Sequence, residues 1–196
     1  MQAFAALLDR LIYTRSRDHK VRLIADYLRT TPDPDRGWAL AALAGTLSIS
    51  TVKAAAIRAM AEERFDPMLF RMSRDYVGDT AETVALMWPD VNQDIVAPTV
   101  SEVIDMLSGT SRARAPAVLA ELMDRLDANG RYALLKLATG GMRVGISARL
   151  AKTAFGQAFG LSVDDVEEVW HALRPPYTEL FAWGEGKTER PDPADS

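Results

Sequence analysis

Apolar side chains recur every three or four residues along most of the chain, which is the spacing that gives a helix one apolar face. Clear examples are Leu7, Leu8, Leu11 and Ile12; Val21, Leu23, Ile24, Tyr27 and Leu28; and Val118, Leu119, Leu122, Met123 and Leu126. The sustained alternation that is typical of half-buried strands is missing. The pattern predicts an all-α fold, a compact multi-helix domain with about ten or more short helices.

Polar residues and prolines divide this pattern into segments. Helix starts are predicted at Ser16 or Asp18, at Ser50 or Thr51 for a helix over 52–64, at Thr99 or Ser101, and at Ser162 for a helix over 163–173. Breaks are predicted at 31–35, 65–67, 77–79, 88–90 and 97–98. The dipeptide Asn129-Gly130 lies between two helical segments and predicts a helix–helix turn. Asp79 and Glu82, after Gly78, predict a capping box at the start of a helix.

The length of 196 residues fits one domain or two small ones. We favour one helical domain over 1–174, because Arg174-Pro175-Pro176 stops a helix and introduces a different kind of sequence. Residues 175–196 are acidic and spaced by prolines, which favours a C-terminal segment and linker towards a further domain. An ordinary frayed C-terminus fits the same residues.

Composition narrows the cellular setting. The chain contains no cysteine, so it can form no disulfide and no thiolate metal site. Its longest charge-free run, 37–52, has 16 residues and is shorter than the roughly 18 to 20 that span a bilayer. The N-terminus lacks the pattern of a secretory signal. We expect a cytoplasmic protein without a membrane partner.

The sequence contains no recognisable catalytic or metal-binding pattern. His19 and His171 are far apart, and neither has a metal-ligand partner three or four residues away. Gly186-Lys187-Thr188 imitates the end of a phosphate-binding P-loop, but Phe181 stands where that pattern requires glycine. We expect no catalytic residue, no metal site and no cofactor in this chain.

The most informative segment is 139–147, with the sequence TGGMRVGIS. Its three glycines, Gly140, Gly141 and Gly145, let the backbone approach another surface closely, because no Cβ is in the way. Exposed N–H groups before a helix favour anions, and Arg143 adds a permanent forked charge suited to phosphate. A purely structural interpretation is equally compatible with the spacing: Gly140 caps one helix and Ser147 begins the next.

Charge distribution favours the anion-binding interpretation. Residues 111–152 carry eight basic and three acidic side chains, a net charge of +5, whereas the whole chain has −4. Such segregation predicts an anionic partner, although any single arginine could belong to a solvated helix face.

Two segments resemble the N-terminal DNA-binding domain of ATP-dependent DNA ligases, the bacterial members especially. Segment 139–147 is similar to the family's G-G-[LM]-R-[IV]-G-[VIL]-[SA] loop, and segment 75–86 (DYVGDTAETVAL) is similar to its G-D-[LT]-[AG]-[EL] helix start. The order and separation of the two segments agree as well. Residues 174–180 (RPPYTEL) look like the family's approach to its adenylation domain, so the resemblance covers essentially the whole chain.

The resemblance implies an all-helical domain that lies across the minor groove of nicked double-stranded DNA and holds its phosphates without reading sequence. It assigns DNA contacts to Gly140, Gly141, Arg143, Gly145 and Ser147, and to Gly78 in the second segment. We add Arg149 and Lys152, which follow the first loop on a predicted helix. Asp79 is an anion, so we expect it to cap its own loop.

One departure from the family limits what this chain can do. The family's nucleotide-accepting lysine lies in a K-x-D-G motif, and none of the five lysines has it. The resemblance therefore implies the front part of a longer ligase of DNA repair, replication or recombination. The adenylation and OB-fold domains of that polypeptide would be partners of this one, and would bind ATP and a divalent metal such as Mg²⁺.

Two other interpretations stay open. A helix-turn-helix module could be formed by 43–64, with the turn at 47–50, but Lys53 is followed by three alanines where base-reading side chains are expected. A helical protein-interaction scaffold would also explain the helices, although no repeat of about 30 to 50 residues is visible.

Overall fold

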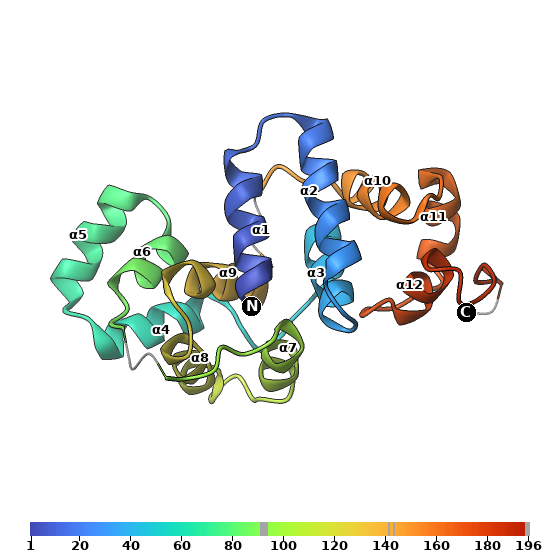
Figure 1. Cartoon of the computed structure of the whole chain (residues 1–196). Helices are drawn as coiled ribbons and strands as arrows, with labels where there is room; N and C mark the ends of the chain where they lie inside the picture. The colour runs from blue at the N-terminus through green and yellow to red at the C-terminus, as the bar shows by residue number, and fades with distance from the viewer. Residues whose placement is uncertain (91–93, 141, 143, 195–196) are drawn as a thin grey trace. The chain divides into compact units, whose positions relative to one another are not determined.

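The computed structural model describes residues 1–90, 94–140, 142 and 144–194. In these residues it contains twelve α-helices and no strand, so the expected all-α class is confirmed (Figure 1). The helices are α1 (Gln2–Tyr13), α2 (Arg17–Thr30), α3 (Asp35–Ala44), α4 (Ala54–Arg64), α5 (Pro67–Val77), α6 (Thr80–Met87), α7 (Val100–Ser108), α8 (Ala115–Asp124), α9 (Ala128–Thr139), α10 (Ala148–Phe159), α11 (Val163–Trp170) and α12 (Thr178–Gly184).

The chain divides into two compact units, each assembled from two separate stretches of sequence. Unit 1 consists of Met1–Ala5 and Ser48–Gly141, and unit 2 of Ala6–Leu47 and Met142–Ser196. The backbone therefore passes from one unit to the other within segment 139–147. The boundary that we predict after residue 174 stays a prediction.

Unit 1 is built around buried arginine as well as apolar side chains. Helix α6 packs on α9 and α5, and α8 packs on α4 and α7. Arg131 of α9 is 2% exposed and donates to the carbonyl oxygens of Met123 (2.9 Å) and Trp88 (3.1 Å). These bonds tie α9 to α8 and to the end of α6. A buried guanidinium is tolerated when its N–H groups are hydrogen-bonded in this way.

Unit 2 is organised around α10, which packs against α2, α3 and α11. Phe155 and Phe159 of α10 contact Phe181 of α12, with ring centroids 5.2 and 5.7 Å apart. The guanidinium of Arg36 lies 4.2 Å from the centre of the Phe181 ring and pairs with Asp33 and Glu185. The last helix is thus integrated into the core of this unit.

Local helix signals hold at most positions. Ser16, Thr99 and Ser162 each accept a hydrogen bond from a first-turn amide, so these predicted starts are confirmed. The predicted start at Ser50 or Thr51 is wrong, because α4 begins at Ala54 after Lys53 and has no side-chain cap. The hydroxyl of Thr51 instead donates to the carbonyl of Leu107 at 2.8 Å.

Two further predictions need correction. Asn129-Gly130 lies inside the first turn of α9 and forms no helix–helix turn, because Asp127 caps that helix by accepting from the Gly130 amide at 2.8 Å. Helix α11 begins after Ser162 as predicted but ends at Trp170 and does not continue to residue 173. No helix in the described ranges is both long and apolar enough to cross a membrane.

Candidate nucleic-acid interface

The glycine loop begins and ends as the cap signals predict. Gly140 closes α9 in the left-handed conformation, with φ of 72°, and Ser147 precedes α10 and accepts the amide of Leu150 at 3.0 Å. Both assignments of the structural interpretation are therefore confirmed. Gly141 and Arg143 lie outside the described residues.

A lysine distant in sequence holds the second half of this loop. The ammonium of Lys20, on α2, donates to the carbonyl oxygens of Val144 (3.4 Å) and Gly145 (3.3 Å). Gly145 has φ of 69°, and a Cβ there would come within 2.6 Å of the Lys20 ammonium nitrogen. The positive φ favours glycine here, since L side chains rarely adopt that backbone conformation, and a Cβ would also push the flexible end of Lys20 away from the loop.

The Lys20 contact engages carbonyl oxygens of the loop and none of its N–H groups. Within the described part of the chain, neither Gly145 nor Ile146 donates its backbone N–H to a protein acceptor. Helix α10 follows directly, and its first turn contains no acidic residue that would neutralise its positive end. This is the electrostatic setting in which helix N-termini bind anions.

The two cations that we added from α10 already have partners. Arg149 pairs with Glu167 at 2.8 Å and Asp164 at 3.4 Å, both from the α11 region. The Lys152 ammonium lies 5.1 Å from the centre of the Trp170 ring. Arg149 is exposed, so a phosphate could compete for it, but only by breaking two ion pairs.

The second motif forms a tight connection between α5 and α6 in unit 1. Gly78 ends α5 with φ of 79°, and Asp79 caps α6 by accepting the Glu82 amide at 2.9 Å, which confirms its predicted capping role. Lys136 of α9 pairs with Asp79 at 2.7 Å. Burial alone would raise the pKa of Asp79, but these hydrogen bonds outweigh it and hold the pKa below its usual value.

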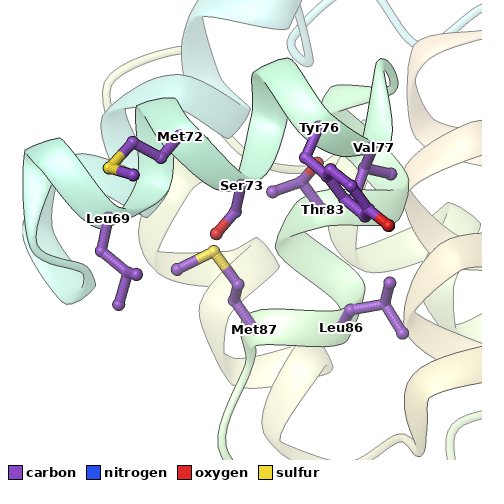
Figure 2. Close-up of a pocket in the computed structure, with 8 residues that line it drawn as sticks. All are labelled: Leu69, Met72, Ser73, Tyr76, Val77, Thr83, Leu86 and Met87. Carbon is purple, nitrogen blue, oxygen red and sulfur yellow. The ribbon is translucent and has the colours of Figure 1, made fainter.

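Apolar side chains of the same segment line a groove between α5 and α6. Figure 2 shows Tyr76 and Leu86 on one part of it and Met72 and Met87 on another. The groove has a volume of about 410 Å³, and no charged side chain lines it. It is therefore chemically unlike a phosphate contact, and the polar side of the motif is the one that faces Lys136.

The structure divides the predicted site residues between the units. Gly78 and Gly140 belong to unit 1, whereas Gly145, Ser147, Arg149 and Lys152 belong to unit 2. Sequence reasoning missed Lys20. The available signal was the basic stretch 10–22 that surrounds Lys20. The N-terminal region as a whole is acidic, so a sum over that region hides this local positive charge.

The net charge of segment 111–152 overstates the cations that are available to a ligand. Besides Arg149, Arg131 is buried, Arg125 pairs with Glu102 at 3.2 Å and Lys136 pairs with Asp79. Acids from other parts of the fold thus engage cations that look unpaired in the sequence.

The helix-turn-helix interpretation meets a geometric obstacle. Helices α3 and α4 are joined by residues 45–53, nine residues in place of the three or four of such a turn. The two helices also belong to different units.

Comparison with known proteins identifies no relative, because neither a family model nor a curated protein matches the chain. In the described ranges, no group of three or more histidine, aspartate and glutamate side chains is arranged to hold a metal ion.

Proposed function

We propose that this chain binds duplex DNA through its phosphate backbone, independently of base sequence, and that it is the N-terminal DNA-binding domain of an ATP-dependent DNA ligase. The observation that carries the proposal is segment 139–147. Its glycine pattern is similar to the ligase loop, and its described end combines a left-handed Gly145, two amides without an acceptor among the described residues, and the start of α10.

The chemistry of this loop suits phosphate better than base edges. Backbone N–H groups and a helix N-terminus recognise an anion of any sequence, and Arg143 adds a forked donor. Base reading would need a row of side chains that fits the major groove. The loop supplies grip and orientation in place of sequence discrimination.

The proposed ligase activity belongs to other domains of the parent polypeptide. No lysine of this chain has the K-x-D-G context for adenylation, so we assign ATP and the divalent metal to the adenylation and OB-fold domains. The role of this domain is to hold both sides of a nick in nicked double-stranded DNA while the adenylation and OB-fold domains act.

Fluorescence anisotropy tests the proposal directly. The chain is titrated onto a labelled nicked duplex, an intact duplex of the same sequence and a single strand, each at two salt concentrations. We expect salt-sensitive binding to both duplexes that does not depend on sequence and is no weaker at the nick. Absence of binding at low salt would contradict the proposal and favour a helical interaction scaffold.

Arg143→Ala is the sharpest variant for this test. We expect weaker duplex binding, by about tenfold for a lost phosphate contact with a guanidinium, and an unchanged melting temperature. The control is Lys53→Ala/Arg58→Ala, which removes two exposed cations, one directly before α4 and one within it. A larger loss in the control than in Arg143→Ala would favour the helix-turn-helix alternative instead.

A further inference from the structure

Basic side chains gather where α1 leads into α2. Residues 10–22 contain one carboxylate, Asp18, and five cations: Arg10, Arg15, Arg17, Lys20 and Arg22. All of them except Lys20 are exposed, and Lys20 is half-buried. This stretch belongs to unit 2, as do the loop residues from 144 to 147.

Lys20 connects this stretch to the glycine loop. Its ammonium binds the carbonyls of Val144 and Gly145, so the first turn of α2 lies directly beside them. Arg17 precedes Lys20 by three residues, and residues at that spacing are neighbours on one face of a helix. Arg17 therefore lies one turn from the loop, on the same face as Lys20.

Folding gives no reason for arginines at this place. Arg17 is the first residue of α2 and Arg15 comes just before its cap, Ser16, so both lie at the positive end of the helix, where cations are unfavourable. Asp18 offsets this only weakly, because its carboxylate is 3.8 Å from the Arg17 guanidinium and both side chains are mostly exposed. Among the described residues, Arg15 has no ion-pair partner.

The availability of these cations contrasts with those on α10. Arg149 is held by two carboxylates and Lys152 lies over an aromatic ring, whereas Arg15 and Arg17 are exposed and only Arg17 has an ion-pair partner among the described residues, Asp18 at 3.8 Å. Arg15 and Arg17 are unfavourable at this helix end. An anionic ligand that also binds the glycine loop would explain why they are there.

We propose that Arg15 and Arg17 form a second contact surface for the DNA phosphate backbone, positioned beside the glycine loop by Lys20. The inference rests on the proposed function, and it extends the interface to residues that the ligase-like motifs do not include. A duplex that contacts the 144–147 loop continues along the start of α2, where each arginine neutralises a phosphate.

The test compares Arg15→Ala/Arg17→Ala with the wild-type chain and with the α4 control, Lys53→Ala/Arg58→Ala, which removes the same number of charges at the start of α4 and within it. Anisotropy with the nicked duplex is recorded at several salt concentrations. Two lost phosphate contacts should weaken binding about tenfold or more near 0.1 M salt, and reduce the slope of log affinity against log salt by about 1.8. The melting temperature should stay constant or rise slightly, because unfavourable charges leave the helix end.

The outcomes separate this inference from the function on which it rests. Suppose that the wild type binds and that Arg143→Ala weakens binding. If Arg15→Ala/Arg17→Ala then changes neither the affinity nor the salt slope, the proposed second surface is wrong, and the glycine loop remains the proposed DNA contact. An equal loss in the α4 control would attribute the effect to net charge and overturn the inference. If the wild type does not bind any duplex, both proposals fail together.

Discussion

Gly145 is the residue at which backbone conformation and a distant side chain meet. Its positive φ and the nearby Lys20 ammonium each favour glycine, and the two effects can be separated. Gly160, which closes α10, has a similar φ of 71° but no heavy atom within 4 Å of the place where a Cβ would lie.

We expect Gly145→Ala to destabilise the protein more than Gly160→Ala does. Both variants incur the left-handed penalty of roughly 1–2 kcal/mol, but only the first displaces Lys20 from the carbonyls of Val144 and Gly145. Hydrogen exchange should therefore accelerate at residues 144–147 in Gly145→Ala alone. Equal exchange in the two variants would show that Lys20 does not hold the loop.

Asp79 is the residue whose ionisation is coupled to stability. Its folded-state pKa is lowered, so the stabilisation is complete above the unfolded pKa of about 3.9 and is lost as the pH falls through the folded value. Asparagine can still cap α6, so Asp79→Asn removes the charge and keeps the cap.

We expect Asp79→Asn to be less stable than the wild type by about 0.5–1 kcal/mol at pH 6, since the pair with Lys136 is partly exposed. The difference should shrink below pH 4, as the wild-type carboxylate becomes protonated. Urea unfolding at pH 6, 4 and 3 measures it. A difference that is constant with pH would contradict the assignment of the ion pair.

At the scale of elements, α3 packs unusually closely against the segment before α12, and both belong to unit 2. A Cβ on Gly37 would lie 1.5 Å from the carbonyl oxygen of Pro176, which is a backbone atom that no rotamer change can move. Tyr177, the next residue, is buried and its hydroxyl lies 2.8 Å from that of Thr46. This packing joins the RPPY segment to α3 and to the residues that directly follow it.

Gly37→Ala tests this contact by the sign of its effect. Helix propensity alone predicts that alanine inside α3 stabilises the protein by about 0.5–1 kcal/mol. The overlap with Pro176 predicts the opposite, a loss of about 3 kcal/mol or more, typical of severe overpacking. Thermal unfolding followed by circular dichroism distinguishes the two, and a stabilised variant would refute the contact.

At the scale of the whole molecule, two features bear on the proposed DNA binding: the net charge of the chain and the places where the backbone passes between the units. The chain has a net charge of −4, so the DNA binding that we propose has to come from local groups, against repulsion by the net charge of the whole chain. The backbone passes between units 1 and 2 at 5–6, 47–48 and 141–142, and the last of these points lies in the glycine loop.

We therefore expect duplex affinity to fall steeply with salt, with a slope of log affinity near −0.9 for each phosphate contact, so that about four contacts give about −3.6. The slope should be the same for two duplexes of unrelated sequence. Titration at 50, 100 and 200 mM salt measures it, and a shallow slope with strong sequence preference would point to base reading.

The helical class, most of the breaks and caps, and the turn chemistry of Gly140, Asp79 and Ser147 could all be predicted from the sequence. These features depend on apolar periodicity and on hydrogen bonds within four residues, which a local pattern contains. The start of α4 could not be read this way, since Thr51 bonds to the distant carbonyl of Leu107. The place of Asn129-Gly130 follows from a local signal that was overlooked, the cap that Asp127 forms three residues before Gly130.

The division into two units and the partners of the cations depend on contacts between distant parts of the chain, so they could not be predicted from the sequence. Lys20 meets Gly145 across 125 residues, and the acids that engage Arg149, Arg125 and Lys136 come from other helices or loops. Long-range contacts of this kind leave no periodic trace in a sequence. For that reason the motif residues could be proposed from the sequence, whereas the contact of Lys20 with the loop became visible only in the folded chain.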